Sequence, residues 1–155
     1  MGIYRCPADK TAVVGYPSVL RTRTYELDGF LNSWYMGAIP PWYPDPWERR
    51  KFSELVNPAP TSVLTFIDSI STDGAADISE FYREATGQDD AWSSLPGEQH
   101  NRGANIAFAD GHVEHWRWRW SRVGGIYDVE STTYPLANAD DRYDFQRVKD
   151  HSRRP

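Results

Sequence analysis

Histidine and acidic side chains gather in one short stretch of the chain, between residues 100 and 115. His100 is followed after nine intervening residues by Asp110, and His112, Glu114 and His115 come directly afterwards. Imidazole and carboxylate groups are common ligands of zinc, and a zinc ion with an open coordination position can activate a water molecule. His100, Asp110, His112 and Glu114 therefore form a candidate metal site for zinc or a similar cation.

The same residues also have a purely structural interpretation. The Asp110-Gly111 pair stands between two strand-like runs and favours a two-residue type I′ hairpin turn, because both residue types tolerate positive φ. In this interpretation Asp110 forms the turn, His112 flanks it, and His100 hydrogen-bonds to the loose backbone beside it. Since turn geometry alone explains the Asp-Gly pair, we favour the structural interpretation over the metal site.

A two-residue turn also determines which side chains share a face of the hairpin, because side chains alternate along a strand. Pairing across such a turn puts Ile106, Phe108 and Val113 on one face. His115 falls on this face too, where we expect a half-buried, hydrogen-bonded histidine. The other face is then expected to carry Ala107, Ala109, His112, Glu114, Trp116 and Trp118.

Tryptophan recurs at every second position at the end of this hairpin. On a strand, Trp116, Trp118 and Trp120 would form one aromatic stripe, with arginines between them on the opposite face. The stripe is either a ligand-stacking platform, for which carbohydrate is the expected ligand of an acidic chain, or part of the core. Large aromatic side chains are mostly buried, so we favour the core.

A small hydrolase acting on a carbohydrate or an ester is the alternative functional class. A glycosidase needs two carboxyl groups roughly 5–9 Å apart. Asp68, Asp110 and Glu114 are the catalytic candidates, together with loop acids such as Asp89 and Asp90. The chain has no Gly-x-Ser-x-Gly elbow, phosphate-binding loop or dinucleotide fingerprint.

Three segments that position these side chains have clear local patterns. Residues 61–68 form a β-branched and aromatic run typical of a central strand, and residues 104–118 form the hairpin. Residues 138–149 are predicted to be a helix, with acids in its first turn and bases towards its end. The proline- and aromatic-rich residues 29–50 and the polar residues 69–99 are expected to be long irregular loops.

Composition excludes several classes of protein. The 155 residues include 17 basic and 22 acidic side chains, a net charge of −5, which argues against binding to nucleic acid or to an anionic membrane surface. The single cysteine, Cys6, excludes an intrachain disulfide and a thiolate zinc cage. No apolar run reaches the roughly 18 residues of a transmembrane helix, so we expect no membrane span in this chain.

The stretch from Gln99 to Glu114, with His100, nine residues and Asp110-Gly111-His112, resembles the C-terminal signature of bacterial prepilin-type, pseudopilin-like proteins. Residues 6–9, 23–29 and 57–68 also resemble parts of this family, so the resemblance covers nearly the whole chain. Family members begin with a leader, a processing site and a long apolar helix. The present chain has none of these and resembles the globular head alone.

The resemblance implies a non-enzymatic head of a type II secretion or pilus-associated protein, located in the periplasm or outside the cell. Its expected partners are other envelope or pilin-like proteins, and polysaccharide is a further candidate. The resemblance also admits a calcium loop, with Asp68, Asp73 and Asp77 as candidate ligands, although the EF-hand spacing is absent. A solvated acidic loop is the simpler interpretation of these residues.

Together these patterns predict a single α+β domain over residues 1–155. We expect a mainly antiparallel sheet centred on residues 61–68 and 104–118, long irregular loops and a short C-terminal helix. This is the architecture of a pseudopilin-like globular head.

Overall fold

The structure, a computed structural model, describes residues 12–13, 16–20, 25–27, 51–68, 91–92, 95–121 and 134–151. In chain order its elements are β1 (Ala12–Val13), β2 (Tyr16–Leu20), β3 (Tyr25–Leu27), the 3₁₀ turns η2 (Phe52–Glu54) and η3 (Pro60–Ser62), β4 (Leu64–Asp68), β5 (Ala91–Trp92), β6 (Gly103–Phe108), β7 (Val113–Arg117), β8 (Tyr134–Pro135) and α1 (Ala139–His151). The predicted loop at residues 29–50 and most of the loop at 69–99 lie outside the described residues.

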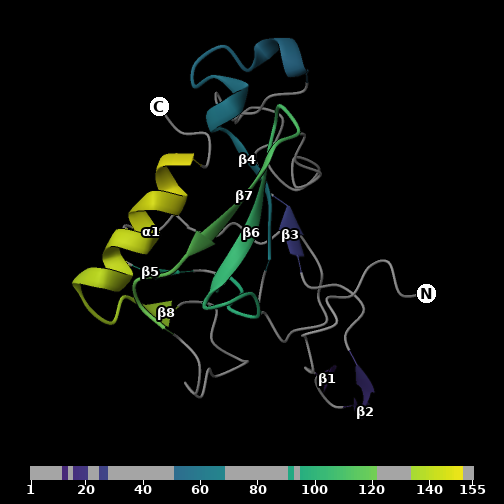
Figure 1. The fold of residues 1–155 in the computed structure, drawn as a ribbon, viewed down its shortest axis with the longest axis vertical. Helices are drawn as coiled ribbons and strands as arrows, with labels where there is room; N and C mark the ends of the chain where they lie inside the picture. The colour runs from purple at the N-terminus through teal and green to yellow at the C-terminus, as the bar shows by residue number, and fades with distance from the viewer. Residues whose placement is uncertain are drawn as a thin grey trace, which may run out of the picture.

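The main sheet has four strands in the order β3-β4-β6-β7, and every neighbouring pair is antiparallel. Figure 1 shows this sheet beside the C-terminal helix α1. The α+β class and the antiparallel sheet are therefore confirmed. Of the segments predicted at the centre, β4 and β6 are central, whereas β7, the second strand of the hairpin, is an edge strand. The strand predicted at 61–68 begins only at Leu64, because Pro60–Ser62 forms a 3₁₀ turn ahead of it. Two small two-stranded sheets, β1-β2 and β5-β8, complete the described strands.

The core lies between the sheet and α1. Ile67 of β4 pairs with Ile106 of β6, and both side chains are fully buried. Phe145 and Val148 of α1 belong to the same apolar cluster, and the edge of the Phe145 ring meets Trp92 with the ring centroids 5.0 Å apart. Burial of these apolar surfaces is the main force that holds the helix to the sheet.

The β6–β7 hairpin has a three-residue loop, so the predicted two-residue turn was wrong. Ala107 pairs with Val113, and Phe108 N donates to His112 O at 3.0 Å. Inside the loop, Gly111 N donates to Phe108 O at 3.0 Å, and Gly111 has a φ of 94°. A loop of three residues with a left-handed glycine in its third position is the common alternative to the two-residue turn. The Asp-Gly pair thus marked the hairpin correctly but not its length.

This one-residue difference in pairing exchanges the predicted faces. Ile106 now lies opposite Glu114, so Trp116 and Trp118 share the buried face with Ile106 and Phe108. His115 does not lie on the Ile106 face as predicted. It lies on the opposite, exposed face with Val113, whose side chain is 65% exposed.

The helix α1 confirms the prediction for residues 138–149 and extends to His151. Its N-terminus is capped by Asn138, whose side-chain oxygen accepts hydrogen bonds from Asp140 N at 3.0 Å and Asp141 N at 3.1 Å. Acidic residues in the first turn and basic residues in the last turn complement the helix dipole. The described part of the chain contains no helix with the length and apolarity needed to cross a membrane.

Two buried carboxylates on α1 accept hydrogen bonds where strands end and loops begin. Asp144, with 0% exposure, accepts from Arg119 N at 2.9 Å and from Trp120 N at 3.0 Å. Asp141 accepts from Trp92 Nε1 at 3.0 Å and from Ala137 N at 2.9 Å. These bonds give hydrogen-bond partners to two carboxylates that are buried, Asp144 completely and Asp141 to 3% exposure.

Replacing the buried acceptor on α1 should weaken the fold. We expect Asp144→Ala to lower the free energy of unfolding by about 1–3 kcal/mol, because the backbone N–H groups of Arg119 and Trp120 lose their acceptor. Asp140→Ala, at an exposed position of the same helix, is the matched control and should cost no more than about 1 kcal/mol. Urea denaturation measures both, and equal losses would contradict the assignment.

Candidate functional site

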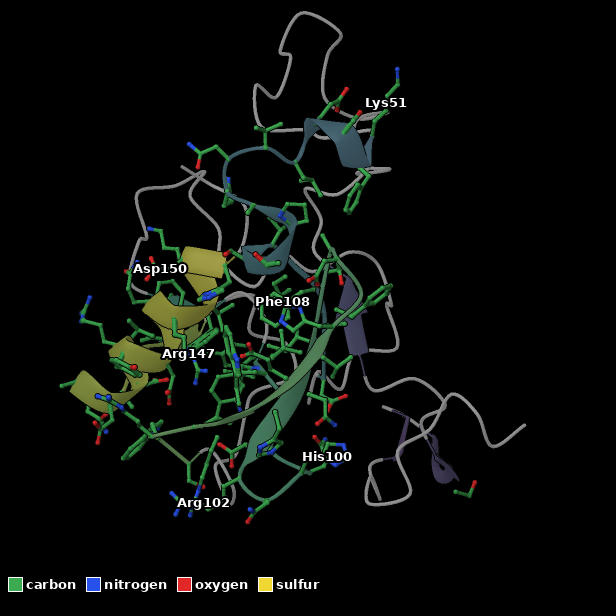
Figure 2. All side chains as sticks on the ribbon, turned by 45° about the horizontal axis from the view of Figure 1, so that its top comes forward. Lys51, His100, Arg102, Phe108, Arg147 and Asp150 are labelled. Atoms are coloured by element: carbon green, nitrogen blue, oxygen red, sulfur yellow. The ribbon has the colours of Figure 1, made fainter. Side chains whose placement is uncertain are left out.

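The predicted site residues occupy two separate clusters at opposite ends of β6. The turn cluster consists of Asp110, His112 and Glu114, at the loop between β6 and β7. The loop cluster consists of Asp68, His100, Asn105 and His115, near the start of β6. In Figure 2, His100 and Phe108 mark these two ends of the hairpin. His100 therefore does not join the other three predicted metal ligands.

In the turn cluster, His112 lies between two carboxylates. Its Nδ1 is 2.5 Å from Asp110 Oδ1, and its Nε2 is 3.5 Å from Glu114 Oε1. Asp110 Oδ1 also accepts from the backbone N–H of His112 at 3.1 Å. The imidazole ring stacks on Phe108, with ring centroids 4.3 Å apart and an interplanar angle of 4°. The other carboxylate oxygen of Glu114 accepts from Trp116 Nε1 at 2.6 Å.

These contacts shift the pKa values in the directions that ion pairing requires. Hydrogen bonds from the backbone and then the side chain of His112 lower the pKa of Asp110. The hydrogen bond to Asp110, followed by the smaller influence of Glu114, raises the pKa of His112. The Trp116 indole, followed by His112, lowers the pKa of Glu114. Each shift favours the charged form of its group, which is the cation for His112 and the anion for the two carboxylates.

The side chains of the turn cluster are not arranged around a common point. The two carboxylates meet different nitrogens of one imidazole ring, so Asp110, His112 and Glu114 do not converge on a common point. Among the residues that the structure describes, no three histidine, cysteine or acidic side chains are arranged to hold a metal ion. Of the four residues predicted to bind zinc, the structure brings Asp110, His112 and Glu114 together and places His100 on Asp68 instead. Of the calcium candidates, Asp73 and Asp77 lie outside the described residues, and Asp68 belongs to the loop cluster.

In the loop cluster, the carboxylate of Asp68 ties β4 to β6. Its Oδ2 accepts from Asn105 N at 2.9 Å and from Asn105 Nδ2 at 3.1 Å, and it lies 3.3 Å from His100 Nε2. His115 Nε2 lies 2.7 Å from the backbone oxygen of His100. Because a carbonyl oxygen can only accept, His115 Nε2 is the donor. The cluster therefore fastens the loop before β6 to the exposed face of the sheet.

The loop itself needs this support, because Asn101 and Arg102 both have positive φ, at 49° and 60°. Left-handed backbone is unfavourable for residues with a Cβ atom, more so for arginine than for asparagine. Gly103 follows, and a Cβ at this position would overlap the backbone oxygen of Trp116 and approach His115 Nε2. The tight path of this loop brings His100 to Asp68 rather than to the hairpin turn.

The candidate catalytic carboxylates of both clusters have partners within the fold. Asp110 and Glu114 both contact the ring of His112. Asp68 is engaged with Asn105 and His100 at the other end of β6. The loop acids Asp89 and Asp90 lie outside the described residues.

The tryptophan stripe is mainly core. Trp116 is 1% exposed and Trp118 is 3% exposed, so neither ring has a free face on which a sugar could stack. Both indole N–H groups are satisfied within the fold, and the Trp118 indole donates to Gly97 O at 2.7 Å. The guanidinium of Arg147 lies 3.8 Å from the Trp116 ring centroid. Of the three, only Trp120 has substantial exposure, at 37%.

Sequence reasoning missed the two buried aspartates of α1. Their signal was weak, because acids at the start of a helix are expected on the solvent side for the helix dipole alone. The spacing of three residues between Asp141 and Asp144 does place them on one helix face, and Asp144, Phe145 and Val148 are all buried. The position of these two acids on the same helix face as the apolar residues was the sequence signal that could have predicted their burial.

Comparison with known proteins gives no relative: no family model, curated protein or solved structure matches the chain.

The loop cluster predicts a clear mutational effect. Asp68→Ala should lower the free energy of unfolding by about 1–3 kcal/mol, because the backbone and side-chain N–H groups of Asn105 lose their acceptor. Asp150→Ala, which removes an exposed carboxylate near the end of α1, is the control and should change stability by less than about 0.5 kcal/mol. Thermal or urea unfolding distinguishes the two, and an unchanged Asp68→Ala variant would contradict this role.

Proposed function

We propose that this chain is the non-enzymatic globular head of a pseudopilin-like envelope protein from a secretion or pilus-type system. The observation that carries the proposal is the structural role of His100 and Asp110, the two residues that resemble the family signature. His100 contacts the carboxylate of Asp68, and Asp110 holds the hairpin turn through His112. Each of these groups braces the fold, as a structural signature in a head domain requires.

The nine-residue spacing of the signature supports a structural role. The six residues of β6 lie between His100 and Asp110, with one tight loop before the strand and another after it. The nine-residue spacing therefore equals the length of one strand together with parts of the loops that flank it. A motif of this kind specifies a hairpin, whereas a catalytic motif would bring its two ends together in space.

The proposed partners are other pilin-like envelope proteins, and the exposed face of the sheet is a suitable surface for them. Val113 on β7 and Phe66 on β4 are 65% and 41% exposed on the face opposite α1. Exposed apolar side chains mark a protein-binding surface where they lie together, and these two lie on the same face of the sheet, on either side of Ala107. The periplasm or the cell exterior is the location that agrees with such partners.

The proposal is tested by crosslinking in the bacterium that produces the protein, with the gene in its natural context. A photo-crosslinking residue at Val113 should capture pilin-like proteins in the envelope fraction, because Val113 is exposed on the proposed contact face. The same residue at Arg142, exposed on α1, is the matched control and should capture far less, because α1 packs on the opposite face of the sheet. Mass spectrometry of the crosslinked species measures both.

Three results would contradict the proposal: recovery of the protein in the cytoplasm, equal capture from both positions, or hydrolysis of a carbohydrate or ester substrate. Hydrolysis that is lost in Asp110→Asn or Glu114→Gln variants, while those variants remain folded, would establish the alternative enzyme class. Retarded migration in polysaccharide gels would instead indicate carbohydrate binding.

A further inference from the structure

The contacts of His112 favour the charged form of its ring. Both ring nitrogens lie next to carboxylate oxygens, Nδ1 next to Asp110 and Nε2 next to Glu114. An ionised carboxylate can only accept hydrogen bonds, and a neutral imidazole has a single N–H to donate. Only the imidazolium form of His112 can donate to both carboxylates at once.

We propose that the β6–β7 turn is a proton-dependent latch, closed when His112 is charged and loosened when it is neutral. In the closed state the His112 ring connects the hairpin loop, through Asp110, to the start of β7, through Glu114. When the proton leaves, one nitrogen faces a carboxylate with no hydrogen between them, and that contact becomes repulsive. The contact with Glu114 is the longer of the two and is the one expected to open.

The latch is connected to the end of α1. Glu114 accepts the indole N–H of Trp116, and the guanidinium of Arg147 from α1 lies over the same indole ring. His151, also from α1, lies edge-on to Trp116 with ring centroids 4.9 Å apart. The charged and titratable groups around the latch are thus Asp110 and Glu114 from the hairpin and Arg147 and His151 from α1. A movement of the Glu114 carboxylate therefore changes the hydrogen bond that the Trp116 indole N–H donates to it.

The direction of the pH dependence follows from the two carboxylates. They raise the pKa of His112 above its ordinary value of 6.5, with the hydrogen bond to Asp110 as the larger cause. A raised pKa in the folded state contributes stability that is fully present below the unfolded value and is lost as the pH rises through the folded value. The latch is therefore closed below the ordinary histidine pKa of 6.5 and opens as the pH rises through the raised pKa of His112 in the folded state.

The experiment is an NMR titration of the whole chain between about pH 5 and about pH 9, with EDTA present so that metal binding plays no part. We expect the His112 ring protons to titrate with a midpoint above 6.5. The indole N–H of Trp116 should shift with the same midpoint, because its acceptor is Glu114. Exchange of the Gly111 amide, which donates to Phe108 O, should accelerate several-fold above that midpoint.

Variants separate the latch from other titrations near Trp116. His112→Gln should abolish the pH step of the Trp116 indole, whereas the matched control His115→Gln, on the opposite face, should leave it intact. If the pH step of the Trp116 indole is instead lost in His151→Gln, the step arises from α1, and the proposal is overturned. Glu114→Gln should lower the His112 midpoint even if His112→Gln does not fold. The proposal is also overturned if His112 titrates with a midpoint at or below 6.5, or if the Trp116 indole signal does not change at the midpoint of His112.

Discussion

The pairing register of β6 and β7 is the constraint on which the rest of the structure depends. Side chains on paired strands alternate between two faces, so a shift of one residue moves every side chain of β7 to the other face. The three-residue loop Ala109–Gly111 sets the register that pairs Ile106 with Glu114. Trp116 therefore packs into the core beneath α1, and His115 reaches the loop before β6 instead.

Polar side chains secure both ends of this hairpin. At the turn, His112 stacks on Phe108 and contacts two carboxylates. At the other end, Asp68 receives the backbone and side-chain N–H groups of Asn105 across the β4–β6 pair. The two ends differ in character: the turn cluster is a group of side-chain ion pairs, whereas the loop cluster combines side-chain contacts with hydrogen bonds to the backbone. Neither set leaves its groups gathered around an open reaction centre.

Buried carboxylates on α1 also act as hydrogen-bond acceptors where the sheet meets the helix. A strand that ends inside a fold leaves backbone N–H groups without ladder partners, and such groups are costly when buried. Asp144 accepts two of them just after β7, and Asp141 accepts one just before α1 together with the Trp92 indole. The helix thus contributes apolar contacts through Phe145 and Val148 and also the hydrogen-bond acceptors that its neighbours require.

Much of the fold was predictable because its signals are local. The β-branched run before Asp68, the Asp-Gly pair of the hairpin and the capped, charge-ordered segment from Asn138 each depend on near neighbours in the chain. Alternation along β7 was also readable, but its phase was not, because the phase depends on a loop one residue longer than expected. The partners of His100 and Asp144 come from strands and loops distant in sequence. Local chemistry therefore determined which elements form, and only tertiary packing decided which faces they bury and which polar groups meet.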